Sequence, residues 1–253
     1  FTPSSAPTTS ASGVLIADSQ RVRLTDCYFN QQANSDATVG LRTVGYTGGF
    51  NAIKVTTLDE NRPSQNIYIA RNFFYGEYQL TGVDPVFRPI LTSKALSVSI
   101  TNNQFGAPGA IPGTLAGEGL DTIGTFYYDY GIYCIDTTFK IIANNIFNPA
   151  HFNNSMVRDE STYSQSDFST NKWSEGGHFI FTGNVGHTIS FDVALLDIRS
   201  GGFINIGGDN EFGQLGIDPD AIAVINIDLG THALNVPVNT GPYIPSLVSI
   251  KGE

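Results

Sequence analysis

Acidic side chains are the residues of this chain best suited to chemistry. The candidates for catalysis, which lie in or beside short strand-like segments and long polar segments, are Asp129, Asp192, Asp197, Glu160 and Glu175. Hydrolysis of a glycosidic bond needs two carboxyl groups, about 5 Å apart for retention or roughly 6.5 to 9.5 Å apart for inversion. Carboxylates on neighbouring strands, about 4.8 Å apart, can supply such a pair. Solvated or turn-capping carboxylates are the alternative interpretation of each.

Aromatic and basic side chains accompany these carboxylates. Aromatic rings stack on the apolar C–H faces of sugars, while carboxylates and amides bind the sugar hydroxyls. The candidates for substrate binding are Tyr127, Tyr128, Tyr130, Tyr163, Trp173, His151 and Arg158. The alternative is that these aromatics simply pack loops onto the body of the protein.

A lyase would need a base such as Lys, Arg, His or Tyr beside a cation that neutralises an acid. Arg158, His151 and Tyr163 are conceivable, and their spacing singles out none of them. The sequence therefore favours hydrolysis over elimination if the chain is an enzyme, and leaves open whether it is one.

A recurring phrase indicates which elements position these residues. An apolar strand runs into an asparagine and then a phenylalanine, as in IARNFF (69–74), ITNNQF (100–105) and IANNIF (142–147). FTGNVG (181–186) is a weaker copy. Aligned, the copies place in one column Asn72, Asn103, Asn145, Asn184 and Asn210, and in another Phe29, Phe74, Phe105, Phe147 and Phe212.

The strand before each asparagine alternates in polarity, so one set of side chains points inward and the other outward. The irregular spacing of the asparagines argues against helical repeats and favours short coils interrupted by loops. Stacked amides hydrogen-bond along such a ladder. We therefore predict an all-β, right-handed parallel β-helix, a single-stranded solenoid with loop insertions, in which Lys140 breaks an inward column beside Ile142.

This prediction divides the chain into few parts. Residues 1–12, rich in Ser, Thr and Pro, are expected to form a linker or an extended leading segment. Residues 13–253 form the β-helix domain, and the last strands, about 221–253, close or cap the coil. Three segments, 77–89, 106–130 and 148–177, are expected to project as loops, where function usually resides. Asp129 and Asp136 are expected on one coil, with Asp192 and Asp197 on the next.

Charge and composition exclude several classes of function. The net charge of −10 argues against nucleic acid as a partner, because phosphates require clustered Lys and Arg. No apolar run approaches the roughly 20 residues that span a bilayer. We predict no cofactor and no metal, because the four histidines lie far apart without ligand spacing. Cys27 and Cys134 are expected to be free thiols, although a disulfide stays possible.

The stacked phrases and loop insertions resemble the pectate-lyase-like superfamily of right-handed β-helix proteins, particularly phage tailspikes and polysaccharide depolymerases. The resemblance implies a long shallow groove that holds an extended bacterial surface polysaccharide, a homotrimer, and a virion, extracellular or cell-surface location. The polygalacturonase-like members carry paired aspartates, a Gly-His-Gly and an Arg-Ile-Lys, which this chain lacks. That activity is therefore not expected here.

Two functions stay open at this point. The first is a tailspike-like or secreted domain that binds a bacterial surface polysaccharide, with cleavage left open; as an enzyme it is expected to be a glycoside hydrolase, with a polysaccharide lyase as the alternative. The second is a non-enzymatic structural or adhesive β-helix, such as a spike shaft or the subunit of a surface filament.

Overall fold

The computed structural model describes residues 11–30, 50–75, 87–106, 126–147, 150–160, 177–199, 202–217, 223–227 and 248–250. These residues form β-strands and no helix. The strands are β1 (Ala11–Ala17), β2 (Arg23–Thr25), β3 (Tyr28–Asn30), β4 (Phe50–Thr56), β5 (Ile67–Ala70), β6 (Phe73–Tyr75), β7 (Phe87–Ser93), β8 (Ser97–Thr101), β9 (Gln104–Phe105), β10 (Phe126–Tyr128), β11 (Ile132–Ile135), β12 (Phe139–Ala143), β13 (Ile146–Phe147), β14 (Ala150–Phe152), β15 (Ser155–Glu160), β16 (Gly177–Thr182), β17 (Val185–Phe191), β18 (Ala194–Arg199), β19 (Gly202–Ile206), β20 (Glu211–Ile217), β21 (Ala223–Ile227) and β22 (Val248–Ile250).

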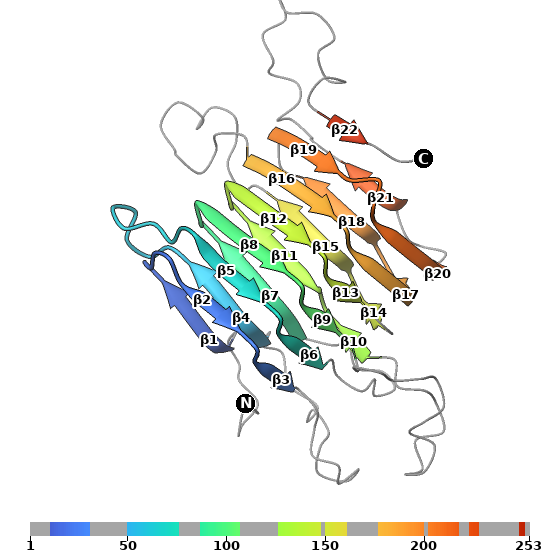
Figure 1. Cartoon of the computed structure of the whole chain (residues 1–253), viewed down its shortest axis with the longest axis horizontal. Coiled ribbons are helices and arrows are strands. Elements are labelled where there is room, and N and C mark those ends of the chain that lie inside the picture. Colours follow the sequence, from blue (N-terminus) through green and yellow to red (C-terminus); the bar gives the residue numbers. More distant parts are fainter. Residues whose placement is uncertain are drawn as a thin grey trace, which may run out of the picture.

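The strands form three parallel sheets, and within each sheet the strands stack along the length of the molecule (Figure 1). The first sheet has the order β1-β4-β7-β11-β15-β18-β21, and the second has the order β2-β5-β8-β12-β16-β19-β22. The third has the order β10-β14-β17-β13-β9-β6-β3, with β20 paired to β17. Because the chain visits the sheets repeatedly in the same sequence, the structure confirms an all-β stack of parallel strands, consistent with a β-helix or solenoid.

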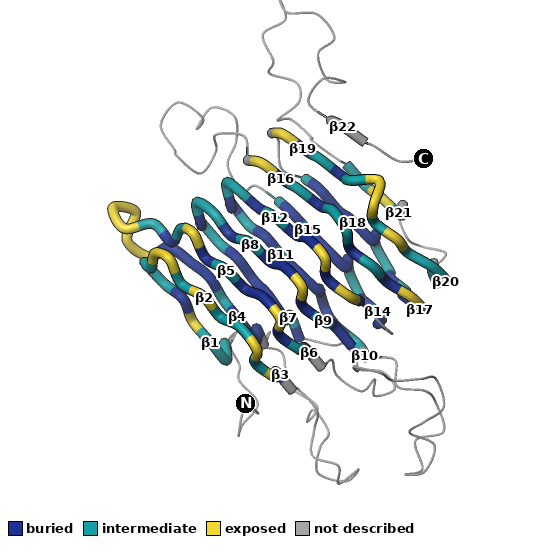
Figure 2. Tube along the Cα trace, in the orientation of Figure 1, coloured by how far each residue is buried: buried dark blue, intermediate teal, exposed yellow. Residues whose placement is uncertain are grey.

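The alternation predicted for the second sheet is confirmed by its register. Ile67, Val98, Lys140, Phe179 and Ile204 occupy one row of paired positions, and all five side chains are buried. Figure 2 shows that the buried residues follow the middle strands of the stack, whereas exposed residues gather at the turns. The apolar side chains thus form one continuous core along the stack.

The asparagine column is a hydrogen-bonded ladder. The Asn72 side-chain amide and backbone N–H both donate to the Asn103 Oδ1, each at 3.0 Å. The same two bonds join Asn103 to Asn145, Asn145 to Asn184 and Asn184 to Asn210. The other amide proton reaches a strand carbonyl of the preceding coil, such as Ile69 O at 3.0 Å from Asn103. The ladder satisfies backbone groups that strand pairing leaves unpaired at the corner.

The left-handed backbone of this corner lies one residue before the ladder. Arg71, Asn102 and Asn144 have φ values of 55° to 56°, and Gly183 has φ 62°. Asparagine tolerates such angles, yet the amides of Asn72, Asn103, Asn145 and Asn184 complete the ladder, and the residue before each of these four makes the bend.

The phenylalanine column is confirmed in its first part and interrupted at one coil. Phe29, Phe74, Phe105 and Phe147 stack in turn, with ring centroids 5.2, 5.1 and 4.5 Å apart. Gly186 occupies the next position, where a Cβ would collide with the Ile189 side chain and lie 2.9 Å from Phe212 Cδ1. The FTGNVG copy of the phrase therefore has glycine where the other copies have phenylalanine, since the side chains of Ile189 and Phe212 fill the space that a ring would need.

Lys140, which interrupts an apolar row, has a charged partner inside the core. Its Nζ lies 2.8 Å from both carboxylate oxygens of Asp159, which points inward from β15. The two side chains are 2% and 0% exposed. Cys134 pairs with Asp159 in the strand register and lies in the same inward row. It is a free thiol, and burial raises its pKa to about 12, with a smaller contribution from Asp159. Cys27, also free, is only partly buried.

Each of the three segments predicted as loops contains strand residues. The first segment ends within β7, the second includes β10, and the third includes β14 and β15. Residues 77–86, 107–125, 148–149 and 161–176 of these segments, and residues 1–10, lie outside the described residues. At the other end, β21 and β22 add the last strands to the first and second sheets. Their capping role stays a prediction, as do the domain boundaries.

Candidate functional site

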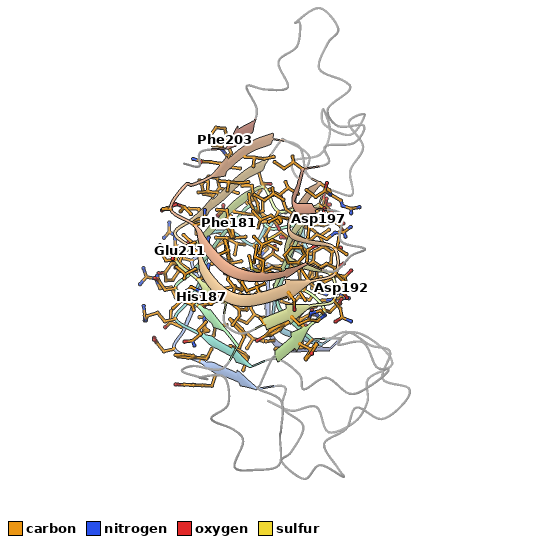
Figure 3. All side chains as sticks on the ribbon, turned by 90° about the vertical axis from the view of Figure 1, so that its right-hand side faces the viewer. Phe181, His187, Asp192, Asp197, Phe203 and Glu211 are labelled. Carbon is orange, nitrogen blue, oxygen red and sulfur yellow. The ribbon has the colours of Figure 1, made fainter. Side chains whose placement is uncertain are left out.

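Charged and aromatic side chains gather on the outer face of the first sheet, at strands β7, β11, β15 and β18. Strand register places Tyr133, Arg158, Asp197 and Asn226 in one outward row. We call the following set the arginine–tyrosine surface: Arg88, Asp129, Tyr130, Tyr133, Arg158, Glu160, Asp197 and Arg199. In Figure 3, Asp197 and Asp192 lie on one side of the stack, and His187 and Glu211 lie on the other.

Arg158 holds two of the predicted catalytic carboxylates. Its Nη2 lies 2.7 Å from Glu160 Oε2, and its Nη1 lies 3.3 Å from Asp197 Oδ2. Two carboxylates that share one planar guanidinium have their bonded oxygens no more than about 8 Å apart. The Tyr133 hydroxyl donates a hydrogen bond to the other oxygen of Glu160.

Asp197 is buried although it belongs to the outer row. Its side chain is 0% exposed and accepts hydrogen bonds from Arg199 Nε at 3.0 Å and Asn226 Nδ2 at 2.8 Å, besides its contact with Arg158. A carboxylate without water needs such charged and polar donors. The Asp197 carboxylate is therefore fixed in place by its neighbours.

A further ion pair of the arginine–tyrosine surface lies at its edge, at the corner before β11. Arg88 Nε lies 2.5 Å from Asp129 Oδ2, and Asn154 Nδ2 donates to Asp129 Oδ1 at 2.5 Å. Three arginines and three carboxylates thus occupy the surface, and its formal charge is balanced.

Two tyrosines stack between the arginines. The Tyr130 and Tyr133 ring centroids lie 4.6 Å apart with an interplanar angle of 23°. The guanidinium carbon of Arg88 lies 5.6 Å from the Tyr130 ring, and that of Arg158 lies 5.9 Å from the Tyr133 ring. Cation–π attraction and the ion pairs together restrict the rotamers of all four side chains.

The environment keeps both phenols protonated and Arg158 charged. Burial raises the pKa of Tyr130, and burial together with the hydrogen bond to Glu160 raises that of Tyr133 well above its ordinary value. Burial lowers the pKa of Arg158, but Glu160, with smaller contributions from Tyr130 and Asp197, more than offsets this effect, so the net shift is upward. These tyrosines are suited to stacking and to donating hydrogen bonds and unsuited to acting as bases.

A smaller cluster lies beside this surface on the third sheet. His151 Nδ1 lies 2.7 Å from Ser190 Oγ, and His151 Nε2 lies 3.4 Å from Asp192 Oδ1. The Tyr127 ring packs against the imidazole with centroids 4.9 Å apart. The structure thus brings together Tyr127, His151 and Asp192, three residues that the sequence singled out, whereas Asp197 belongs to the first sheet.

Two expectations need correction. Tyr128, predicted to bind substrate, is 0% exposed and points into the core, where its hydroxyl donates to Phe74 O at 2.8 Å. Asp192 and Asp197 do not lie on the coil next to Asp129, because β14 and β15 form a coil between them. The error arose because segment 148–177 was interpreted as one loop. Glu175, Tyr163 and Trp173 lie outside the described residues.

Several residues of both clusters were not predicted as site residues. Tyr133 could have been found from the alternation in GIYCID, since its inward neighbours Ile132 and Cys134 are apolar. Arg199 follows Asp197 at the same-face spacing of two residues. Nothing in the sequence pairs Ser190 with His151, because their contact depends on strand register.

No group of three or more His, Cys, Asp or Glu residues in the described part of the chain could hold a metal ion. Within the same residues, no helix is long and apolar enough to cross a membrane.

Comparisons with protein families, with curated proteins and with solved structures found no match for this chain.

Proposed function

We propose that this chain is a right-handed parallel β-helix that binds an extended polysaccharide across the arginine–tyrosine surface. The observation that carries the proposal is the stacked Tyr130 and Tyr133 pair, held between Arg88 and Arg158 and next to Glu160 and Asp129. Tyr133, Arg158 and Glu160 are partly exposed, and their ring face, donors and acceptors match the alternating apolar and hydroxyl faces of a sugar. Tyr130 is only 9% exposed and supports Tyr133 by stacking on it.

The charge of the surface favours a neutral polysaccharide. Each arginine there already faces a carboxylate, so an anionic sugar would have to displace one of these partners. The chain as a whole has a formal charge of −10 and repels polyanions. A neutral sugar instead adds hydrogen bonds to the remaining lone pairs and N–H groups, and its binding depends little on salt.

Glu160 and Asp197 are the carboxylates that we propose for hydrolysis, if the bound chain is cleaved. They lie on adjacent strands, and their attachment to Arg158 keeps their bonded oxygens no more than about 8 Å apart, below the upper limit of the separations that glycoside hydrolases use. Because the Asp197 side chain is 0% exposed, this role requires its contacts with Arg199 and Asn226 to open when the sugar binds. The protonated state of Tyr133 supports hydrolysis over elimination, since a lyase would use such a phenol as a base.

The setting that we propose is a bacteriophage tailspike-like or secreted protein that engages a bacterial surface polysaccharide, as a trimer. This part rests on the resemblance of the ladder phrases to tailspikes. The structure supports it through the confirmed asparagine ladder and the stacked parallel sheets.

A non-enzymatic structural or adhesive role is the second candidate, and one observation favours it. An outward row on the third sheet contains in order Tyr28, Phe73, Gln104 and Ile146, and its apolar members Tyr28 and Ile146 are 64% and 44% exposed. Tyr28 and Phe73 stack with their centroids 4.7 Å apart. Such a row suits contact with another protein chain.

Incubation of the wild-type protein with a panel of bacterial capsular and O-antigen polysaccharides tests the proposal. Binding is followed together with new reducing ends and the absorbance of unsaturated uronates. We expect binding to a neutral polymer, and reducing ends without that absorbance if Glu160 and Asp197 act in hydrolysis. Absorbance together with reducing ends would indicate a lyase. The absence of both binding and cleavage across the panel would favour the structural role.

A further inference from the structure

The cluster of Ser190, His151 and Asp192 has an arrangement that polysaccharide binding does not require. The imidazole contacts the serine hydroxyl through Nδ1 at 2.7 Å and the carboxylate through Nε2 at 3.4 Å. All three side chains project outward, from β14, from the neighbouring strand β17 and from the turn directly after β17. Exposure of 19% for His151 and 37% for Asp192 leaves the cluster accessible.

One tautomer of the imidazole gives its two nitrogens the roles that ester hydrolysis needs. When Nε2 carries the proton and faces Asp192, Nδ1 is the acceptor for the Ser190 hydroxyl. Tyr127 lies directly beside His151 in the register, and its ring limits the rotation of the imidazole. Burial raises the pKa of Tyr127, so its phenol stays neutral and does not compete for the Ser190 proton. Nucleophile, base and orienting carboxylate are thus in contact.

We propose that Ser190, His151 and Asp192 hydrolyse carboxylic esters. Ser190 Oγ forms a bond to the acyl carbon as His151 Nδ1 takes the hydroxyl proton. The ester C–O bond then breaks, and the leaving alcohol receives that proton. Water, deprotonated by His151, adds to the acyl-serine and releases a carboxylic acid and the original serine. Asp192 stabilises the imidazolium formed in each step.

The position of the cluster indicates the class of ester. Asn154, three residues after His151, donates to Asp129 of the arginine–tyrosine surface, so the two sites adjoin at the corner between the third and first sheets. An acyl group on a sugar hydroxyl, such as an O-acetyl group, suits this placement. This choice of substrate rests on the proposed function, whereas the ester hydrolysis itself does not.

Hydrolysis of 4-nitrophenyl acetate by the wild-type protein tests the chemistry without any polysaccharide. We expect S190A and H151A each to lower kcat at least about 100-fold. S99A, which changes an outward serine of the second sheet, is the matched control and should keep the wild-type rate. Wild-type hydrolysis no faster than buffer overturns the proposal. Loss of activity in H151A with full activity in S190A also overturns it, since the imidazole would then act without the serine.

Covalent labelling keeps the test decisive if a variant fails to fold. A fluorophosphonate probe should add one phosphonyl group to the wild-type peptide that contains Ser190 and abolish hydrolysis. A folded wild-type protein that the probe leaves unlabelled contradicts the proposal. Release of acetate from an O-acetylated neutral polysaccharide then tests the substrate class. If the small ester is hydrolysed and the polymer is not, the assignment of the substrate as an acylated sugar fails while the ester site stands. Binding of the same polymer tests the proposed function separately.

Discussion

Strand β15 places two ionic arrangements on opposite faces of one strand. Asp159 points inward and pairs with Lys140 in the core, whereas its neighbours Arg158 and Glu160 point outward and join the arginine–tyrosine surface. The inner pair is nearly without solvent, and each member has the other as its main charged partner. The outer ions share several partners and stay 17% and 20% exposed. The comparison separates ion pairs that the fold needs from those that a ligand can use.

Removing one member of the inner pair should have the largest effect on stability. K140A leaves the Asp159 carboxylate buried without its cation, and we expect a loss of about 3 to 5 kcal/mol in the free energy of unfolding. Denaturant unfolding followed by circular dichroism measures it. The double variant K140M/D159L replaces both charges with apolar volume and should recover most of that loss. Equal instability of the single and double variants would show that the ion pair itself is required.

The middle of the asparagine ladder should come next. N145A removes the acceptor for two donors of Asn103 and the donor to Ile100 O, all of them buried. Each unsatisfied group costs about 1 to 3 kcal/mol. Unfolding of N210A, at the partly exposed end of the ladder, provides the comparison and should show a smaller loss because water can replace the amide. Equal losses at the two positions would contradict this account of the ladder.

R158A should cost less stability than K140A, about 1 kcal/mol or somewhat more, because Asp197 keeps Arg199 and Asn226 as partners. Its effect on polysaccharide binding should instead be large, since both Tyr133 and Glu160 lose their fixed neighbour. The same unfolding assay, together with binding to the polymer found in the panel, measures both. An R158A protein as unstable as K140A would remove the distinction between the two faces of β15.

The smallest effect that we predict is a pH dependence at Tyr133. Its pKa is raised in the folded state by burial and by the hydrogen bond to Glu160. The stability linked to this shift is present below the unfolded-state pKa of about 10 and is lost as the pH rises above it. Comparing thermal unfolding at about pH 8 and about pH 11, we expect a larger fall in Tm for the wild type than for Y133F. Equal falls would show that Tyr133 titrates normally.

The sequence predicted what repeats and missed what depends on one contact. The columns of asparagine and phenylalanine were readable because the same residue recurs at each corner. The partner of Lys140 was not readable, because Asp159 belongs to a short polar strand, SMVRDE, that has no apolar alternation. Because this segment was predicted as a loop, the sequence did not show that Arg158 and Glu160 lie on a strand. The coil that this strand adds between Asp129 and Asp192 was missed for the same reason. Alternation alone would have placed Tyr127 outside and Tyr128 inside.

Polysaccharide binding by tyrosine variants tests the central claim most directly. The measurement is the Kd of the polymer found in the panel for the wild type, the Y130A/Y133A variant and the Y28A/F73A variant, each confirmed as folded. The account predicts that Y130A/Y133A weakens binding at least about 10-fold, because the exposed Tyr133 ring loses its contact with the sugar, for which we take the roughly 1 to 3 kcal/mol of an aromatic ring stacked on a base, and Tyr130 no longer holds Tyr133 in place. Y28A/F73A, which removes a stacked pair from the third sheet, should bind like the wild type. Unchanged binding in Y130A/Y133A, or equal losses in both variants, would contradict the claim.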